Sequence, residues 1–129
     1  TGCRNLLNYG HDFGHALEST SNFAMPHGQA VVFGIMAANL IAQRRGLLGD
    51  QLEKEITRLL LNPCLIVKPS PKALDADLLI NAMKKDKKRT GENLALILMT
   101  NDFKFIRIND LLEGDFLVIL DILRGRLLA

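Results

Sequence analysis

The chain has 129 residues, of which 48% are hydrophobic and 23% charged, and its formal net charge is +2. That length and balance are typical of a single globular domain with a modest hydrophobic core. The small net charge argues against a nucleic-acid partner. No apolar run approaches the roughly 18 residues of a membrane span, and no secretory signal is present, so we expect no membrane partner.

The cysteines and the first residue indicate the chain's context. Cys3 and Cys64 lack any paired spacing, which favours a reduced, cytoplasmic setting. The chain starts at Thr1 rather than at a methionine. We therefore expect it to be part of a longer protein.

The first predicted helix runs from about Arg4 to Ser19. Its interior contains Gly10 and Gly14, and each glycine costs near 1 kcal/mol in a helix. Two interpretations stay open. The glycines let another backbone or a ligand approach closely, or they break the helix.

One face of this helix is polar where a soluble helix would normally be apolar. At about 100° per residue, this face carries Arg4, Asn8, His11 and His15. Such groups are costly to bury without partners, so the face is predicted to meet a ligand. His27 follows Pro26, which is typical of a helix start. A histidine pair four apart is by itself more often structural, but all three histidines lie within 17 residues, which favours a metal site.

The second predicted helix runs from about Pro26 to Arg45 and is apolar over most of its circumference, so we expect it to be buried and central. Small residues share a face with His27 and permit close packing: Val31, Gly34 and Ala38. Gly46 is predicted to end the helix.

Asp50 is predicted to cap a third helix that runs to about Leu61, with Glu53 completing a capping box. Its expected buried face consists of Leu52, Ile56, Leu59 and Leu60. The proline-rich segment from Cys64 to Lys72 is predicted to be an extended linker.

Asp75 or Asp77 opens a fourth predicted helix, whose apolar side is expected to be Leu78, Leu79, Ala82 and Met83. This helix runs into the cluster from Lys84 to Arg89. Read alone, the cluster is typical of a solvated helix end whose cations complement the helix dipole, and the lack of interleaved aromatic residues argues against a nucleic-acid patch. A turn is predicted from Thr90 to Asn93.

The strands Leu94 to Met99 and Phe103 to Ile108 are predicted to form a hairpin around residues 100–102. Asn109 or Asp110 is predicted to cap a last helix to about Leu127. Its apolar positions are Leu112, Phe116, Ile119, Leu120 and Leu123. Together these elements predict a mainly α fold, a multi-helical domain over residues 1–129 with one short β-hairpin.

The polar motif resembles a known family. Residues 8–18 (NYGHDFGHALE), 27–31 (HGQAV) and 34–38 (GIMAA) are similar to the C-terminal, metal- and substrate-binding domain of 3-dehydroquinate synthase and its sugar-phosphate cyclase relatives. That family reads roughly N-x-G-H-x-x-G-H-A-x-E, then H-G-E-A-V-x-x-G-M. The likeness continues in Asp86-Lys87-Lys88 and the apolar run after it, and so covers nearly the whole chain.

The resemblance implies a role for each matching residue. It makes His11 and His27 ligands of a divalent metal, usually zinc and otherwise cobalt, with a third ligand, a glutamate, upstream of this chain. It places the catalytic candidates His15 and Asn8 near the substrate phosphate. It assigns Arg4 to the substrate carboxylate, and Lys87 or Lys88 to the phosphate. The residue types suit these roles, since planar Arg matches a carboxylate and Lys a phosphate.

The implied reaction converts a phosphorylated seven-carbon sugar acid, 3-deoxy-arabino-heptulosonate 7-phosphate, into 3-dehydroquinate and phosphate in the shikimate pathway. NAD would be bound mainly by an N-terminal α/β domain absent from this chain, and the full-length enzyme would be a homodimer. We expect the isolated chain to be inactive and to bind zinc weakly.

Two departures from the family pattern concern the substrate more than the metal. Gln29 stands where Glu usually follows His-Gly, and Asp12 stands where Thr or Ser is common. Neither residue belongs to the implied ligand set.

Three alternatives remain. The first is another sugar-phosphate cyclase, of the 2-epi-5-epi-valiolone or 2-deoxy-scyllo-inosose synthase type, against which Arg4 argues because those substrates lack the carboxylate. The second is the helical domain of a metal-dependent alcohol dehydrogenase, against which the Asp86-Lys87-Lys88 motif argues. The third is a non-enzymatic helical binding module, which leaves the polar stripe unexplained.

Overall fold

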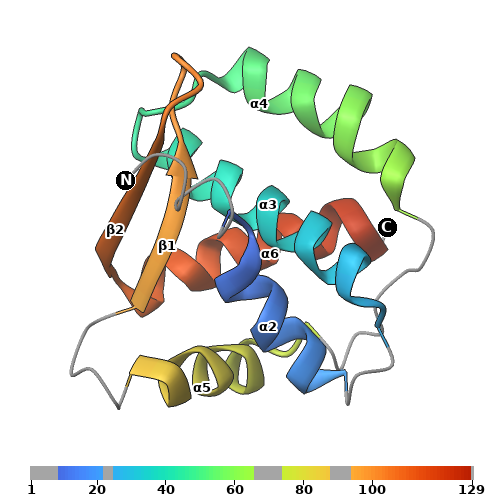
Figure 1. Ribbon diagram of the computed structural model, residues 1–129, viewed down its shortest axis with the longest axis vertical. Coiled ribbons are helices and arrows are strands. Elements are labelled where there is room, and N and C mark those ends of the chain that lie inside the picture. The colour runs from blue at the N-terminus through green and yellow to red at the C-terminus, as the bar shows by residue number, and fades with distance from the viewer. Residues whose placement is uncertain (1–8, 22–24, 66–73, 88–93, 129) are drawn as a thin grey trace.

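The computed structural model describes residues 9–21, 25–65, 74–87 and 94–128. Within these ranges it does not describe the side chains of residues 11, 12, 85–87, 94, 95, 127 and 128. Figure 1 shows a group of helices with one hairpin at its left-hand edge, which confirms the predicted mainly α fold. The elements in chain order are α2 (His11–Thr20), α3 (His27–Arg44), α4 (Asp50–Ile56), a π-helical turn η1 (Thr57–Leu61), a 3-10 turn η2 (Asn62–Cys64), α5 (Ala76–Lys87), β1 (Leu94–Met99), β2 (Phe105–Leu111) and α6 (Glu113–Leu128).

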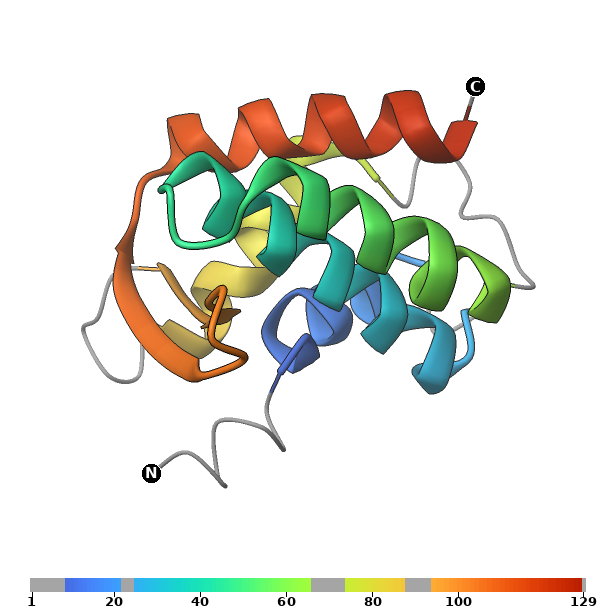
Figure 2. The same cartoon turned by 90° about the horizontal axis from the view of Figure 1, so that it is seen from above.

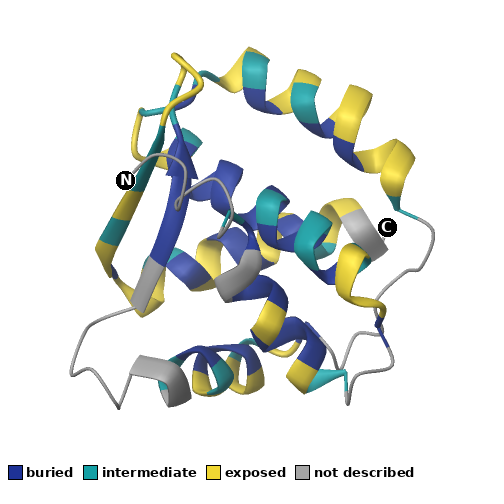
Figure 3. Cartoon of the chain, viewed as in Figure 1, coloured by how far each residue is buried: buried dark blue, intermediate teal, exposed yellow. Residues whose placement is uncertain are grey.

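Helix α3 is the central element, as its apolar circumference predicts. It lies between α2 and α6 in the view of Figure 2, and it is dark blue along most of its length in Figure 3. Phe33, Met36 and Leu40 are among its fully buried side chains. Pro26 precedes its first turn as the N-cap residue. No described helix is long and apolar enough to cross a membrane.

Gly46 ends the α3 region, as predicted, in a left-handed conformation with φ 75°. The N–H of Gly46 donates to the carbonyl of Gln43 at 3.1 Å, and the N–H of Leu47 donates to that of Ala42 at 2.9 Å. This pair of hydrogen bonds is a Schellman motif, which satisfies carbonyls that a helix end would otherwise leave without partners.

Helix α2 begins at His11, and residues 4–8 of the predicted helix lie outside the described residues. Gly10 has φ 80°, a left-handed conformation that ends helical geometry. A Cβ atom on Gly34 would lie 1.9 Å from the carbonyl oxygen of Gly10, and one on Gly14 would lie 3.1 Å from that of Ala30. Both interpretations of the glycines therefore hold: they break the helix at Gly10 and bring two backbones into contact.

The predicted capping box of the third helix is wrong. The N-cap residue of α4 is Gly49, while the Oδ1 atom of Asp50 accepts a hydrogen bond from Nε2 of Gln43 at 2.9 Å. Glu53 points inward and is fully buried. Its carboxylate pairs with Arg126 of α6 instead of the helix start.

The predicted buried face of this helix is also wrong in part. Leu59 and Leu60 are 56% and 63% exposed, whereas Thr57 and Leu61 are buried. The ion pair of Glu53 with Arg126 turns the face that carries Glu53 and Thr57 toward the core. The π turn η1 has more residues per turn than an α-helix, which changes the periodicity on which the prediction depended. Leu52 and Ile56 lie at the edge of the core, as expected.

Asp75 caps α5, since its Oδ1 accepts a hydrogen bond from the N–H of Leu78 at 3.0 Å. Leu79 and Met83 are buried as predicted, but Leu78 is 41% exposed and Ile80 replaces it in the core. Most of the predicted linker (66–73) and the predicted turn at 90–93 lie outside the described residues.

The hairpin pairs β1 and β2 antiparallel, with Leu96 opposite Ile108 and Met99 opposite Phe105. Phe103 is not in the strand: it sits in the turn with φ 59° and is 63% exposed. Strand β2 runs on to Leu111, so Asn109 and Asp110 are strand residues and not helix caps.

Helix α6 buries four of the five predicted apolar positions, namely Phe116, Ile119, Leu120 and Leu123. The fifth, Leu112, precedes the helix and is 67% exposed. An ion pair between Lys84 and Glu113 joins α5 to the start of α6.

Candidate metal and substrate site

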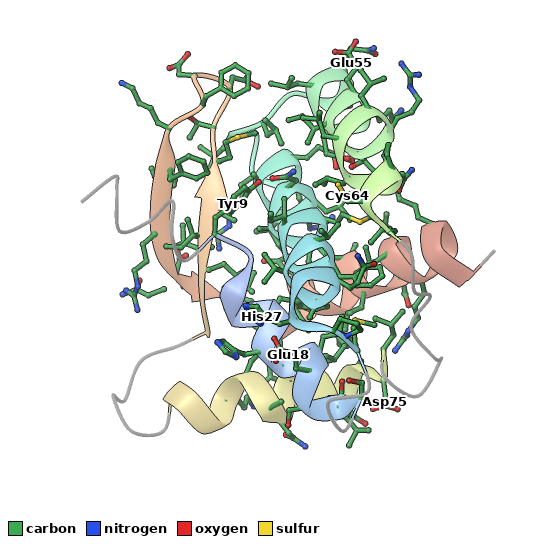
Figure 4. The ribbon with its side chains drawn as sticks, turned by 45° about the vertical axis from the view of Figure 1, so that its right-hand side comes forward. Tyr9, Glu18, His27, Glu55, Cys64 and Asp75 are labelled. Carbon is green, nitrogen blue, oxygen red and sulfur yellow. The ribbon has the colours of Figure 1, made fainter. Side chains whose placement is uncertain are left out.

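Helices α2 and α3 bring three polar side chains of the motif together. The Nδ1 atom of His27, in the first turn of α3, lies 2.6 Å from Oε1 of Glu18 on α2. The ring centroids of His15 and His27 are 6.0 Å apart. Figure 4 shows Glu18 and His27 next to one another where the two helices meet. The arrangement groups two imidazoles with a carboxylate.

The opposite face of α2 fixes this arrangement. Phe13 and Leu17 are fully buried, and the ring of Phe13 packs against that of Phe116 with centroids 5.7 Å apart. Burying these two side chains sets the rotation of the helix, which leaves His15 exposed and Glu18 at the edge of the core. The apolar pattern of α2 thus orients its polar residues.

Local hydrogen bonds close the C-terminus of α2. The Oγ of Ser21 donates to the carbonyl of Glu18 at 2.9 Å, and the N–H of Ser21 donates to that of Leu17 at 3.0 Å. Met25 is buried and precedes the start of α3. His27 is therefore positioned by the end of α2, by the buried side chain of Met25 and by the first turn of α3.

The residue types at this site suit a borderline metal ion such as zinc, but the described residues alone do not complete a ligand set. Imidazole nitrogens and carboxylate oxygens are the ligands that zinc takes together with cysteine. His27 is 56% exposed, while the Glu18 carboxylate is 12% exposed. Among the residues that the structure describes, no three His, Cys, Asp or Glu side chains form a metal-binding group.

The remaining predicted site residues are placed only in part. Arg4, Asn8 and Lys88 lie outside the described residues. His11 begins α2 and Lys87 ends α5, but their side chains are not described. Helix α5, which ends at Lys87, packs against α2 (Figure 1). The structure thus brings His15 and His27 together.

The sequence reasoning did not single out Glu18. A signal was available, because Glu18 follows His15 by three residues and would lie near it on a helix. Its burial and its contact with His27 depend on the packing of α3, which the helix pattern of one segment does not reveal.

Tyr9 and Asn39 form a second polar pair that the sequence did not single out. The hydroxyl of Tyr9 donates to Oδ1 of Asn39, and the Tyr9 ring lies edge-on to Phe105 with centroids 5.0 Å apart. Burial raises the pKa of the Tyr9 hydroxyl well above its ordinary value of 10, although the Asn39 hydrogen bond opposes this shift. Within the described residues, Nδ2 of the fully buried Asn39 has no hydrogen-bond partner.

Gln29 follows His27 by two residues in the first turn of α3 and makes a contact that a carboxylate could not make. Its Nε2 atom donates to the backbone carbonyl of Cys64 in η2 at 2.7 Å. An ionised glutamate has no donor hydrogen and would place one acceptor against another. The amide of Gln29 therefore fits this contact with Cys64 better than the carboxylate of a glutamate would.

Comparison with known proteins identifies relatives of this chain. A family model described as 3-dehydroquinate synthase C-terminal matches residues 1–89. The 3-dehydroquinate synthase of Dehalococcoides mccartyi (strain BAV1) is 36% identical over 120 residues, which cover 93% of this chain and 33% of the relative. That of Methylococcus capsulatus (strain Bath) is 40% identical over 100 residues, which cover 77% of this chain and 28% of the relative. The chain spans about a third of the length of the curated relatives that it matches.

Solved structures share the fold. The 2-epi-5-epi-valiolone synthase ValA of Streptomyces hygroscopicus subsp. jinggangensis 5008, solved with NAD+ and Zn2+ bound, aligns with a TM-score of 0.75 at 24% identity, over 94% of this chain and 33% of that one. A 2-deoxy-scyllo-inosose synthase complexed with carbaglucose-6-phosphate, NAD+ and Co2+ aligns with a TM-score of 0.61 at 21% identity, over 93% of this chain and 34% of that one.

Proposed function

This chain belongs to the 3-dehydroquinate synthase C-terminal domain family, and we propose that it supplies the metal- and substrate-binding residues for conversion of 3-deoxy-arabino-heptulosonate 7-phosphate to 3-dehydroquinate and phosphate. The observation that carries the proposal is the meeting of α2 and α3, which sets His15 and His27 with ring centroids 6.0 Å apart within the motif typical of the family. In this proposal an NAD-binding domain outside these residues completes the enzyme, which acts as a homodimer.

His11 and His27 are the proposed metal ligands, and a carboxylate from outside this chain is the third. Two neutral imidazoles and a carboxylate suit zinc or cobalt and leave a position open to substrate oxygens. When bound, the metal would supply Lewis-acid polarisation of those oxygens, and NAD would supply reversible hydride transfer. The NAD+ and Zn2+ bound in the solved ValA structure support the proposed cofactor and metal.

The other polar residues of the motif are proposed to hold the substrate. Arg4 pairs with the carboxylate, because a planar guanidinium can donate two parallel hydrogen bonds to it. Asn8, His15 and one of Lys87 and Lys88 surround the phosphate. His15 is exposed on α2, so its imidazole can exchange a proton with a phosphate oxygen as that group leaves.

The test measures phosphate release by the protein that carries this chain, purified with its metal and supplied with NAD. We expect release with 3-deoxy-arabino-heptulosonate 7-phosphate, none with sedoheptulose 7-phosphate, and a loss of at least about 100-fold in Arg4→Ala, since removing a charged partner of a bound ion costs several kcal/mol. Arg58→Ala, at an exposed arginine of η1, is the matched control. Release with sedoheptulose 7-phosphate instead would make the protein a cyclase of another substrate class and would leave Arg4 without its role.

The isolated chain is expected to be inactive and to hold zinc weakly, since two of three ligands lie within it. Equilibrium dialysis against zinc measures this directly, with His27→Ala as the variant that removes a ligand. Tightly held stoichiometric zinc in the isolated chain would contradict the expectation and would indicate that a local carboxylate, such as Asp12 or Asp86, serves as the third ligand.

A further inference from the structure

We propose that Glu18 is a positioning residue for the metal site, whose carboxylate fixes the tautomer and the orientation of the His27 ring. The inference rests on the proposed function, in which His27 is a metal ligand. It adds a residue that belongs neither to the proposed ligands nor to the proposed substrate contacts.

The contact itself defines the tautomer. Oε1 of Glu18 lies 2.6 Å from Nδ1 of His27. An ionised carboxylate only accepts hydrogen bonds, so the hydrogen must be on Nδ1, and the neutral ring then carries its lone pair on Nε2. A ring held in this way can coordinate a metal only through Nε2.

The two side chains differ in freedom, which shows which one orients the other. The carboxylate of Glu18 is 12% exposed and the ring of His27 is 56% exposed. The backbone of Glu18 is held as well, because the neighbouring Leu17 is fully buried and the backbone carbonyl of Glu18 accepts a hydrogen bond from the Ser21 hydroxyl. The carboxylate is therefore the fixed partner, and the more exposed imidazole is the group that it holds in place.

A purely structural role explains the contact less well. Helices α2 and α3 are already joined by the close approach of Gly10 to Gly34 and by the burial of Phe13 and Phe33. A hydrogen bond to so exposed a partner adds little to stability. A carboxylate that accepts from the second nitrogen of a ligand histidine is, in contrast, a usual feature of metal sites, and its loss typically lowers metal affinity 10- to 100-fold.

The first experiment records the histidine tautomers of the metal-free protein that carries this chain, by long-range 1H–15N NMR. We expect His27 to be protonated on Nδ1 in the wild type and in Glu18→Gln, whose amide oxygen still accepts. Glu18→Met has a similar size and no acceptor, so its His27 is expected to change to mixed tautomers. Glu55→Met, at an exposed glutamate of α4, is the matched control and is expected to leave His27 unchanged.

The second experiment titrates the same four proteins with Co2+ and follows visible absorption. We expect a 10- to 100-fold weaker affinity in Glu18→Met, a smaller loss in Glu18→Gln, and none in Glu55→Met. A wild-type tautomer or a wild-type cobalt affinity in Glu18→Met would overturn the positioning role alone. If the wild-type protein binds no cobalt at all although His27 is protonated on Nδ1, the metal site proposed above is overturned, and the positioning role with it.

Discussion

Two buried glutamates join different pairs of helices in this molecule. Glu18 links α2 to α3, and Glu53 links α4 to α6. Both oxygens of Glu53 are used within the protein: Arg126 donates to them at 2.8 and 3.0 Å, and Thr57 donates at 2.8 Å. Glu18 contacts a ring that is itself more than half exposed. A carboxylate that is saturated internally fixes the fold, whereas one that holds an exposed imidazole prepares it for a ligand.

The two pairs of helices are also held together by different interactions. The contact between α2 and α3 depends on the close approach of the backbones at Gly10, Gly14 and Gly34 and on buried apolar side chains. The contact between α4 and α6 depends on the buried carboxylate of Glu53 and its partners. The following variants test this difference, from the largest expected effect to the smallest.

Gly34→Ala is expected to have the largest effect, because its new Cβ would lie 1.9 Å from a backbone oxygen that cannot move without displacing α2. We expect the free energy of unfolding to fall by more than about 3 kcal/mol, the upper range for overpacking a core. Urea unfolding measures it. Gly125→Ala, where a Cβ meets nothing within 4 Å, is the control and should gain about 0.5–1 kcal/mol. Wild-type stability of Gly34→Ala would mean that the two helices do not depend on close approach.

Arg126→Ala is expected to lower the free energy of unfolding by about 3 kcal/mol, because it leaves the fully buried Glu53 without its charged partner. Arg44→Ala, which breaks an exposed pair with Asp115, is the control and should cost at most about 1 kcal/mol. Replacing the pair with Glu53→Leu and Arg126→Met together should recover most of the loss. Equal effects of the two single arginine variants would mean that the buried pair contributes no more to stability than an exposed one.

Tyr9→Phe tests the buried pair beside α3 and has a defined pH dependence. At neutral pH it should lower the free energy of unfolding by about 1–2 kcal/mol, because Oδ1 of the buried Asn39 loses its donor. Burial raises the pKa of Tyr9 above its ordinary value of 10, so the folded state keeps a proton that the unfolded state releases, and the wild type loses stability as the pH rises past about 10. The difference between Tyr9→Phe and the wild type should therefore shrink above that pH. A difference that stays constant to high pH would show that Tyr9 titrates normally.

Gln29→Glu is expected to have the smallest effect, at most about 1 kcal/mol. It removes the donor to the carbonyl of Cys64, but a negative charge in the first turn of α3 is favourable and offsets part of the loss. A sharper measurement is the rate at which Cys64, which is exposed, reacts with a thiol reagent in a Cys3→Ser background. We expect faster reaction in Gln29→Glu and in Gln29→Ala than in the wild type, and an unchanged rate would mean that the contact does not hold the 62–64 turn.

Where local chemistry decides the structure, prediction from sequence succeeded. The apolar circumference of α3, the glycine after it and the capping carboxylate of Asp75 all act within a few residues of their position. The β-branched and aromatic residues of 94–108 likewise indicated the hairpin. His15 and His27 lie close together, with ring centroids 6.0 Å apart, but their roles and those of Arg4, Asn8, His11, Lys87 and Lys88 stay predictions.

Where a distant partner decides, prediction failed. Glu53 fits a capping box in sequence, but Arg126, which is 73 residues away, draws it into the core. Leu59 and Leu60 continue an apolar pattern that the π turn interrupts. Asn109 and Asp110 are good caps, but pairing with β1 keeps the strand going to Leu111.

The sequence by itself determined the helical class, the central helix and the histidine motif that marks the family, because periodicity, capping and motif spacing are written in neighbouring residues. The tertiary structure decided which faces of α2 and α4 are buried, that Gly10 and Gly34 bring two backbones together, and that Glu18 holds His27. These outcomes depend on contacts between segments whose relative positions only packing can fix.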